Sequence, residues 1–237
     1  MWIRGVRAFR VAVVVAIAVS DACGSEPPRD EASARQVTAV PKKPGPVDSR
    51  PKIVFLGDSL TIGLGLPHSE AYPSLLQERL NKEGFDYAVV NAGVSGDTSA
   101  GGLSRLDWAL QGDVRILVVA LGGNDALRGL PPTALKQNLA TIIERAQAHD
   151  ISVILAGMDA PPNWGRAYIV SFHKVYPELA EQYHVPLVPF LLQGVAGIDE
   201  LNQPDGIHPT AAGARIVADN VWHVLKPIVQ GQKRATS

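Results

Sequence analysis

The stretch Lys52-Ile-Val-Phe-Leu-Gly-Asp-Ser-Leu-Thr61 decides the fold of the domain that follows it. Residues Ile53 to Leu56 are wholly apolar and rich in β-formers, which predicts a short strand buried on both faces, as in a parallel sheet. Gly57 ends this strand, and Asp58 and Ser59 follow at once. Ligands of parallel α/β sheets bind outside the carboxyl ends of the strands, so Ser59 occupies a position suited to chemistry. The alternative is a plain turn in which Asp58 and Ser59 hydrogen-bond to nearby backbone.

Apolar strand-like segments alternate with amphipathic helical segments along the rest of the chain. Strands are expected at 53–56, 87–91, 115–121, 151–156 and 185–189, helices at 69–80, 103–110, 131–149, 166–183 and 209–225, and loops at 62–68 and 93–102. Strict alternation with right-handed crossovers predicts a parallel sheet with helices on both faces, which is a three-layer α/β/α sandwich.

The first 23 residues have the features of an export signal. An arginine-containing start precedes a nine-residue apolar run, Val11 to Val19, which is too short to span a bilayer comfortably. Cys23, the only cysteine, follows this run in a context that resembles a bacterial lipoprotein cleavage site. We therefore expect an exported protein, periplasmic or attached to the cell envelope, with lipid on Cys23 as its membrane anchor. Ordinary cleavage near Ala22, which would leave a soluble secreted protein, is the alternative.

Composition and charge limit the remaining organisation and the possible partners. Residues 24–50 are rich in proline, serine and charge and predict a flexible linker, 51–230 form one folded domain, and 231–237 a tail. The formal net charge is −1 and no basic block is present, so nucleic acid is not expected as a partner. The single cysteine excludes an intrachain disulfide, and no Walker loop, HExxH or paired CxxC suggests a phosphate loop or zinc site.

Four loops with unusual polar residues follow predicted strands or precede the last helix. They are Gly57-Asp-Ser59, Ser95-Gly-Asp97, Gly122-Gly-Asn-Asp125 and Asp205-Gly-Ile-His208. The first three come directly after strand ends and should meet at one edge of the sheet, where the fourth can join them. Each signal is weak alone, but their joint occurrence in this order indicates a catalytic site.

These loops supply the parts of a serine nucleophile system. A serine needs a base to take its proton and a third group to orient that base. Asp205 and His208 are three residues apart, so the carboxylate can meet one ring nitrogen while the other faces Ser59. The alternative is that Asp205 only forms an Asx-turn. Among the other histidines, His68 lies in a predicted loop near the nucleophile and could line the pocket.

Acyl transfer also needs hydrogen-bond donors for the developing oxyanion. The candidates are the backbone N–H groups of Ser59 and Gly96 and the side-chain amide of Asn124. Glycine at 96 allows close approach of the backbone to a ligand, and Gly123 could let the chain turn so that the Asn124 amide points inward. Ordinary loop chemistry is the alternative, because glycine and asparagine favour turns.

The chain resembles the SGNH, or GDSL, hydrolase superfamily over nearly all of residues 51 to 228. The similarity extends to the bacterial thioesterase I, lysophospholipase and arylesterase branch through Phe55-Leu-Gly-Asp-Ser-Leu60, Val90-Asn-Ala-Gly-Val-Ser-Gly-Asp-Thr-Ser99, Leu121-Gly-Gly-Asn-Asp-Ala-Leu-Arg-Gly129, Asn163-Trp-Gly-Arg-Ala-Tyr168 and Asp205-Gly-Ile-His-Pro209. The resemblance implies a flavodoxin-like five-stranded parallel sheet, no metal and no cofactor. It also implies that Ser59 is the nucleophile, His208 the base, Asp205 its orienter, and Gly96 and Asn124 oxyanion donors. The Gly-x-Ser-x-Gly elbow of α/β-hydrolases is absent.

We therefore predict a serine esterase or thioesterase that cleaves aryl esters, short-to-medium acyl esters or lysophospholipids through an acyl-enzyme. A carbohydrate O-acetyl esterase acting on cell-wall or extracellular glycans is the alternative within enzymes. A surface binding protein with a dead site is the alternative from another class. The oligomeric state is left open.

Overall fold

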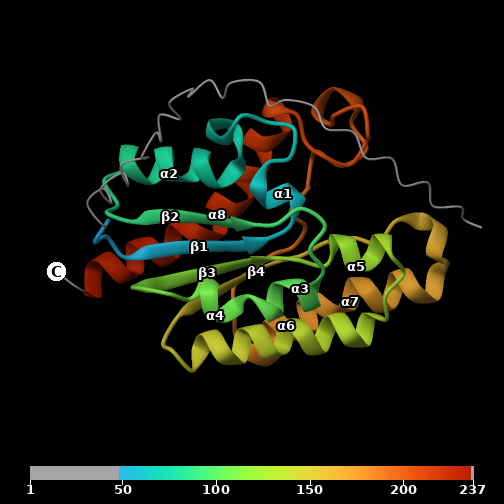
Figure 1. Cartoon of the computed structure of the whole chain (residues 1–237), viewed down its shortest axis with the longest axis horizontal. Coiled ribbons are helices and arrows are strands. Elements are labelled where there is room, and N and C mark those ends of the chain that lie inside the picture. The colour runs from blue at the N-terminus through green and yellow to red at the C-terminus, as the bar shows by residue number, and fades with distance from the viewer. Residues whose placement is uncertain (1–47, 236–237) are drawn as a thin grey trace, which may run out of the picture. The chain divides into compact units, whose positions relative to one another are not determined.

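The computed structural model describes residues 48–235, and these contain a five-stranded parallel sheet (Figure 1). The strand order is β2-β1-β3-β4-β5, and every neighbouring pair is parallel. The strands are β1 (Lys52–Gly57), β2 (Ala88–Gly93), β3 (Val114–Ala120), β4 (Ser152–Ala156) and β5 (Leu187–Val188). This order is the flavodoxin-like one, so the predicted fold class is confirmed.

The core of the sheet is made by β1 and β3, which lie side by side at its centre. Ile53, Phe55, Ile116 and Val118 are completely buried, as expected for strands covered by helices on both faces. The register aligns Gly57 of β1 with Ala120 of β3, so the two strands end at the same level. We call the side of the sheet where the strands end the carboxyl edge.

Two groups of helices cover the two faces. Helices α2 and α8 pack against each other on one face, whereas α3, α4, α6 and α7 lie on the other (Figure 1). The main helices are α2 (Tyr72–Lys82), α3 (Ser99–Ser104), α4 (Leu106–Ala109), α6 (Pro132–Gln147), α7 (Arg166–Tyr183) and α8 (Ala211–Ala235). Short helical turns are α1 (Ser59–Ile62), α5 (Gly123–Leu127), η1 (His68–Glu70), η2 (Pro162–Trp164) and η3 (Asp199–Leu201).

The predictions of loops at 62–68 and 93–102 were partly wrong, because short helices at the carboxyl edge include some of these residues. Helix α1 begins at Ser59 and ends at Ile62, and Gly63, with a positive φ of 78°, caps its end. Helix α3 occupies the second half of the predicted 93–102 loop despite its glycines. Gly102 has a packing reason there, since a Cβ would lie 2.2 Å from Leu121 Cδ1. The two glycines lower the helix propensity of this segment, and the helix forms where α3 packs against α6 and α4.

The ends of the last helix also differ from the prediction. Pro209 precedes the helix and forms an isolated antiparallel bridge with Asn202. At the other end α8 continues through Pro227 to Ala235, so the predicted tail at 231–237 is helical through residue 235. Leu225 and Val229, one turn apart, are both fully buried, and burial of this apolar face carries the helix past the proline.

No helix within residues 48–235 is both long and apolar enough to cross a membrane. The predicted signal peptide, the Cys23 lipid site and nearly all of the predicted linker lie outside the described residues.

Candidate active site

The candidate nucleophile, Ser59, is the first residue of α1, directly beyond the end of β1. Asp58 caps this turn, because its Oδ1 accepts a hydrogen bond of 3.0 Å from the Leu60 N–H. Gly57 permits the sharp strand-to-helix change, since a Cβ there would lie 2.0 Å from Thr61 Oγ1. Ser59 is therefore held by a capped helical turn, not by the loop that the sequence predicted.

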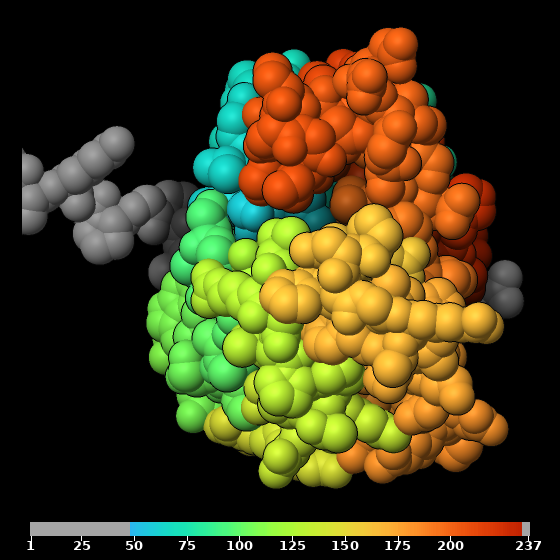
Figure 2. Space-filling model, turned by 90° about the vertical axis from the view of Figure 1, so that its right-hand side faces the viewer, coloured from blue at the N-terminus to red at the C-terminus, as the bar shows by residue number. Residues whose placement is uncertain are grey.

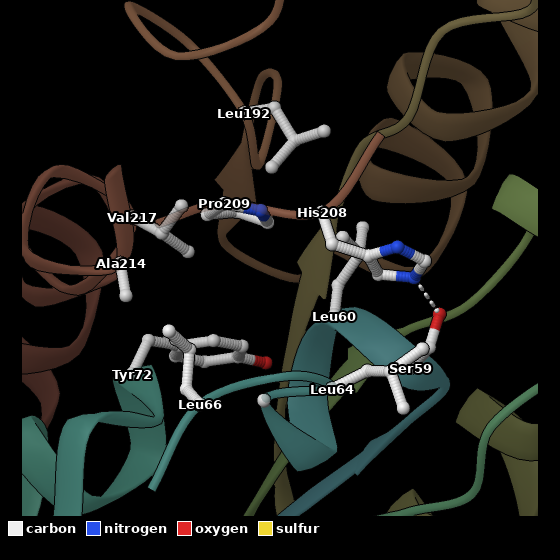
Figure 3. A pocket seen from close by; sticks show the side chains of 11 residues that line it. Ser59, Leu60, Leu64, Leu66, Tyr72, Leu192, His208, Pro209, Ala214 and Val217 are labelled. Carbon is white, nitrogen blue, oxygen red and sulfur yellow. Dashed lines mark hydrogen bonds between the residues drawn. The ribbon is translucent and has the colours of Figure 1, made fainter. Parts of the chain in front are cut away.

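His208 joins Ser59 to Asp205 by two hydrogen bonds. Its Nε2 lies 2.8 Å from Ser59 Oγ, and its Nδ1 lies 2.7 Å from Asp205 Oδ2. Figure 3 shows the His208 ring directed at the Ser59 hydroxyl. The structure thus brings together two residues that are 149 positions apart, in the order needed for a base that is oriented by a carboxylate.

The second oxygen of Asp205 forms the Asx-turn that the sequence analysis treated as the alternative. Its Oδ1 accepts hydrogen bonds from the backbone N–H groups of Ile207 (2.9 Å) and His208 (3.0 Å). The turn and the histidine contact coexist, because each uses a different carboxylate oxygen. The backbone N–H of His208, its ring and the Ile207 N–H lower the pKa of Asp205 to about 2, so this carboxylate is ionised at neutral pH.

Two backbone N–H groups in the segments after β1 and β2 have no acceptor among the described residues. Among the hydrogen bonds of residues 48–235, none has the N–H of Ser59 or of Gly96 as its donor. Gly96 is the third residue of a β-turn that the Asp97 N–H closes onto Val94 O at 3.1 Å, and its φ is +81°. A positive φ at this position is the mark of a type II turn and explains the glycine. Both groups are available to a ligand.

Asn124 lies in α5, just beyond β3, and its side-chain nitrogen has two partners. Nδ2 donates to Asp97 O at 3.0 Å and to Asp58 Oδ2 at 3.2 Å. The turn that presents it depends on Gly122, with φ of +116°, and not on Gly123 as predicted. A Cβ on Gly122 would lie 2.1 Å from the Tyr176 hydroxyl oxygen. The amide therefore links the loops that follow β1, β2 and β3.

Sequence reasoning missed the contribution of Asp58 to this site. The residue is only 3 % exposed, and burial raises the pKa of its carboxyl group to about 6, against the hydrogen bonds from Leu60 and Asn124. Its position between Gly57 and Ser59 indicated a turn and gave no signal of the contact with Asn124. His68, by contrast, lies in η1 beside Ser74 (3.5 Å) and does not line the cleft described below.

An open cleft of about 400 Å³ adjoins Ser59 and His208. Much of its lining is apolar, including Leu127, Met158, Phe190, Leu192 and Ile207. In Figure 2 the face is hollowed between the segment near residue 200 and the segments near residues 125 and 160. This volume is in the range of small-molecule sites.

A second pocket, which also borders Ser59 and His208, lies between α2 and α8. Its walls include Leu64, Leu66, Tyr72 and Val217 (Figure 3). It has room for about one water molecule, so an acyl chain or aromatic group fits only the larger cleft. Within residues 48–235 no three His, Cys, Asp or Glu side chains are grouped so that they could hold a metal ion.

Comparisons with known proteins agree with this geometry. Residues 55–216 match the model of the GDSL-like Lipase/Acylhydrolase family. The chain is 48% identical to esterase TesA of Pseudomonas aeruginosa over 178 residues, which are 75% of this chain and 89% of the relative. It is 37% identical to an arylesterase of Vibrio mimicus over 175 residues, which are 73% of this chain and 88% of the relative.

Solved structures show the same fold. A crystal structure of TesA, at 47% identity, aligns with a TM-score of 0.72 over 74% of this chain and 98% of the other. The structure of AlinE4, an SGNH-hydrolase family esterase, aligns at 42% identity with a TM-score of 0.64 over 76% and 96% of the two chains. The predicted family and the predicted enzyme class, an ester hydrolase, are confirmed. The chain belongs to the GDSL-like lipase/acylhydrolase family and has the fold of its SGNH esterases.

Proposed function

We propose that this protein hydrolyses carboxylic esters and thioesters through an acyl-enzyme formed on Ser59. The observation that carries the proposal is the unbroken chain of hydrogen bonds from Asp205 through His208 to Ser59, with heavy-atom distances of 2.7 and 2.8 Å. These distances are within the range required for proton transfer between a nucleophile and its base. Ser59 and His208, at one end of this chain of hydrogen bonds, border the apolar cleft, where an ester can reach the Ser59 hydroxyl.

In the first half-reaction, His208 Nε2 takes the proton of Ser59 while Oγ bonds to the carbonyl carbon. The resulting tetrahedral intermediate collapses when His208 returns that proton to the leaving alcohol or thiol. Water then repeats the sequence on the acyl-enzyme, releases the carboxylic acid and restores Ser59. Asp205, ionised at neutral pH, holds the ring and stabilises its charged form throughout.

The developing oxyanion requires donors that are already in position. The free N–H groups of Ser59 and Gly96 provide two, and Asn124 the third. Because both N–H bonds of the Asn124 amide have protein partners, one of them must be exchanged for the oxyanion. We expect the bond to Asp58 to be exchanged, since at 3.2 Å it is the longer of the two.

The apolar lining of the cleft favours acyl or aryl groups over sugars. Relatives of this chain are named arylesterase and thioesterase 1/protease 1/lysophospholipase L1, which fits substrates with an apolar portion. A carbohydrate O-acetyl esterase would instead need polar side chains for sugar hydroxyls. A panel of p-nitrophenyl esters, acyl-CoA thioesters and acetylated sugars separates these substrate classes by kcat/KM.

A fluorophosphonate probe tests the nucleophile directly. The native protein should be labelled stoichiometrically and Ser59→Ala not at all, whereas a binding protein with a dead site would leave both unlabelled. Asn124→Ala tests the third donor: loss of one oxyanion donor costs about 10²–10³ in kcat, with a much smaller change in KM. A normal kcat in a variant with a lowered melting temperature would show that Asn124 only shapes its loop.

We also propose that the protein is exported and anchored to the membrane by lipid on Cys23. The support is the sequence alone: a nine-residue apolar run followed by the single cysteine of the chain. A flexible linker from 24 to 50 would then leave the catalytic domain free to meet substrates near the membrane.

A further inference from the structure

Arg105, at the junction of α3 and α4, contacts two of the segments that carry the proposed oxyanion donors. Its Nε donates to Asp97 Oδ2 at 2.6 Å, and its Nη2 donates to Gly57 O at 2.8 Å. The side chains of Arg105 and Asp97 are 17% and 18% exposed, so this ion pair is largely shielded from water. It differs in this respect from the exposed pair of Arg115 with Asp113 near the start of β3, whose side chains are 59% and 50% exposed.

Both acceptors of Arg105 lie within two residues of a proposed oxyanion donor. Gly57 is two residues before Ser59, and Asp97 directly follows Gly96. The same Gly57 carbonyl also accepts the Val94 N–H at 3.1 Å, and Val94 begins the turn that contains Gly96. One guanidinium group therefore ties the end of β1 to the turn after β2.

The third proposed donor belongs to the same network. The backbone oxygen of Asp97 accepts the 3.0 Å hydrogen bond from Asn124 Nδ2. A movement of Asp97 would therefore shift the Asn124 amide as well as the Gly96 N–H. Close packing of the Asp97 carboxylate leaves it little freedom, because a Cβ on Gly101 would lie 2.7 Å from its Oδ1.

We propose that Arg105 is a positioning residue that sets the spacing between the oxyanion donors of Ser59, Gly96 and Asn124. The inference rests on the proposed function of these three groups. A planar guanidinium can hold a carboxylate and a carbonyl in one fixed geometry, whereas a lysine ammonium is a point charge on a flexible stem. Arg105 Nη1 is buried without a partner among residues 48–235, so the bonds to Asp97 and Gly57 are the ones that hold the guanidinium group.

The test compares Arg105→Lys with Arg115→Lys, a matched change in the exposed pair at the other end of the sheet. Fluorophosphonate titration first gives the concentration of competent sites, so kcat refers only to folded enzyme. We expect Arg105→Lys to lower kcat about 10–100-fold with KM changed less than about threefold, because small misplacements of catalytic groups are costly. Arg115→Lys should keep the native kcat.

Asp97→Asn is a second variant that weakens the same ion pair, and it should lower kcat in the same way. The double variant Arg105→Lys/Asn124→Ala completes a double-mutant cycle. If both changes act on one oxyanion, the fold-loss in kcat of the double variant should be clearly smaller than the product of the two separate fold-losses. A multiplicative loss would show that Arg105 acts elsewhere.

The proposal is overturned if Arg105→Lys keeps kcat per titrated site within about twofold of native, or if KM rises while kcat is unchanged. Failure of the proposed function has a different signature. In that case Ser59→Ala and Asn124→Ala would retain native turnover, whatever the behaviour of the Arg105 variants.

Discussion

Asp58 is a buried carboxyl group beside the nucleophile, and replacing it by asparagine should change how stability depends on pH. Burial raises its pKa from 3.8 to about 6 in the folded protein. Between these two values the folded state binds more protons than the unfolded chain, so the free energy of unfolding falls as pH rises. The stability that neutral Asp58 contributes is complete below pH 3.8 and is lost as pH rises through about 6.

The magnitude follows from the size of the shift. About two pKa units at 1.36 kcal/mol each amount to about 3 kcal/mol between pH 3 and pH 7.5. In Asp58→Asn the new amide cannot ionise, keeps an oxygen for the Leu60 N–H and loses the acceptor for Asn124. The lost hydrogen bond changes the free energy of unfolding by the same amount at every pH. The ionisation of Asp58 is therefore reported only by how the difference in unfolding free energy between the two proteins changes with pH.

Urea unfolding followed by tryptophan fluorescence, at half-unit steps from pH 3.5 to 7.5, measures this difference. The stability of Asp58→Asn relative to native should rise by about 3 kcal/mol across the range, with unchanged m-values. Asp86→Asn, which removes an exposed carboxylate, controls for the change in net charge. A flat difference, or one that falls with pH, would refute the reasoning, because the hydrogen bonds to Asp58 would then balance or outweigh its desolvation.

The remaining predictions concern the nucleophile, the backbone beside it and the anchor. Ser59→Ala should abolish p-nitrophenyl acetate hydrolysis with a native circular dichroism spectrum, and residual turnover above the contaminant level would contradict the nucleophile assignment. Gly57→Ala should destabilise by several kcal/mol, because its Cβ would meet Thr61 Oγ1 at 2.0 Å. Gly231→Ala, in α8 with nothing within 4 Å, should stabilise by up to about 1 kcal/mol, and melting curves compare the two. Cys23→Ser should release the protein from the membrane fraction without changing esterase activity; equal retention after a high-salt wash would argue against lipidation.

Much of the architecture follows from local sequence. The apolar run of β1 and the alternation of strand and helix predict the layers, because the spacing of apolar residues within each segment indicates which of its faces is buried. The pairing of Asp205 with His208 is also local, because three residues across a turn bring the carboxylate to the ring. These features depend on neighbours in the chain, which is why a single sequence is enough to predict them.

Helix ends and glycine-rich segments depended on tertiary packing. Helix α3 forms against α6 although Gly101 and Gly102 weaken it, and Gly102 is required where the helix comes too close to Leu121 for a side chain. Helix α8 passes Pro227 because Val229 is buried in the core. Propensity opposes both outcomes, and the burial that overrides it comes from strands and helices distant in sequence.

The chain by itself determined the strand that leads to Ser59, the layered order of the fold and the candidate catalytic residue types. Only the tertiary structure decided that His208 reaches Ser59, that Asn124 is held between Asp58 and Asp97, and that Arg105 ties the Gly96 turn to the end of β1. Periodicity and short-range turns depend on residues that are close together in the sequence, so the sequence alone predicts them. Distances between loops that follow different strands are set by sheet register and helix packing, which no local pattern contains.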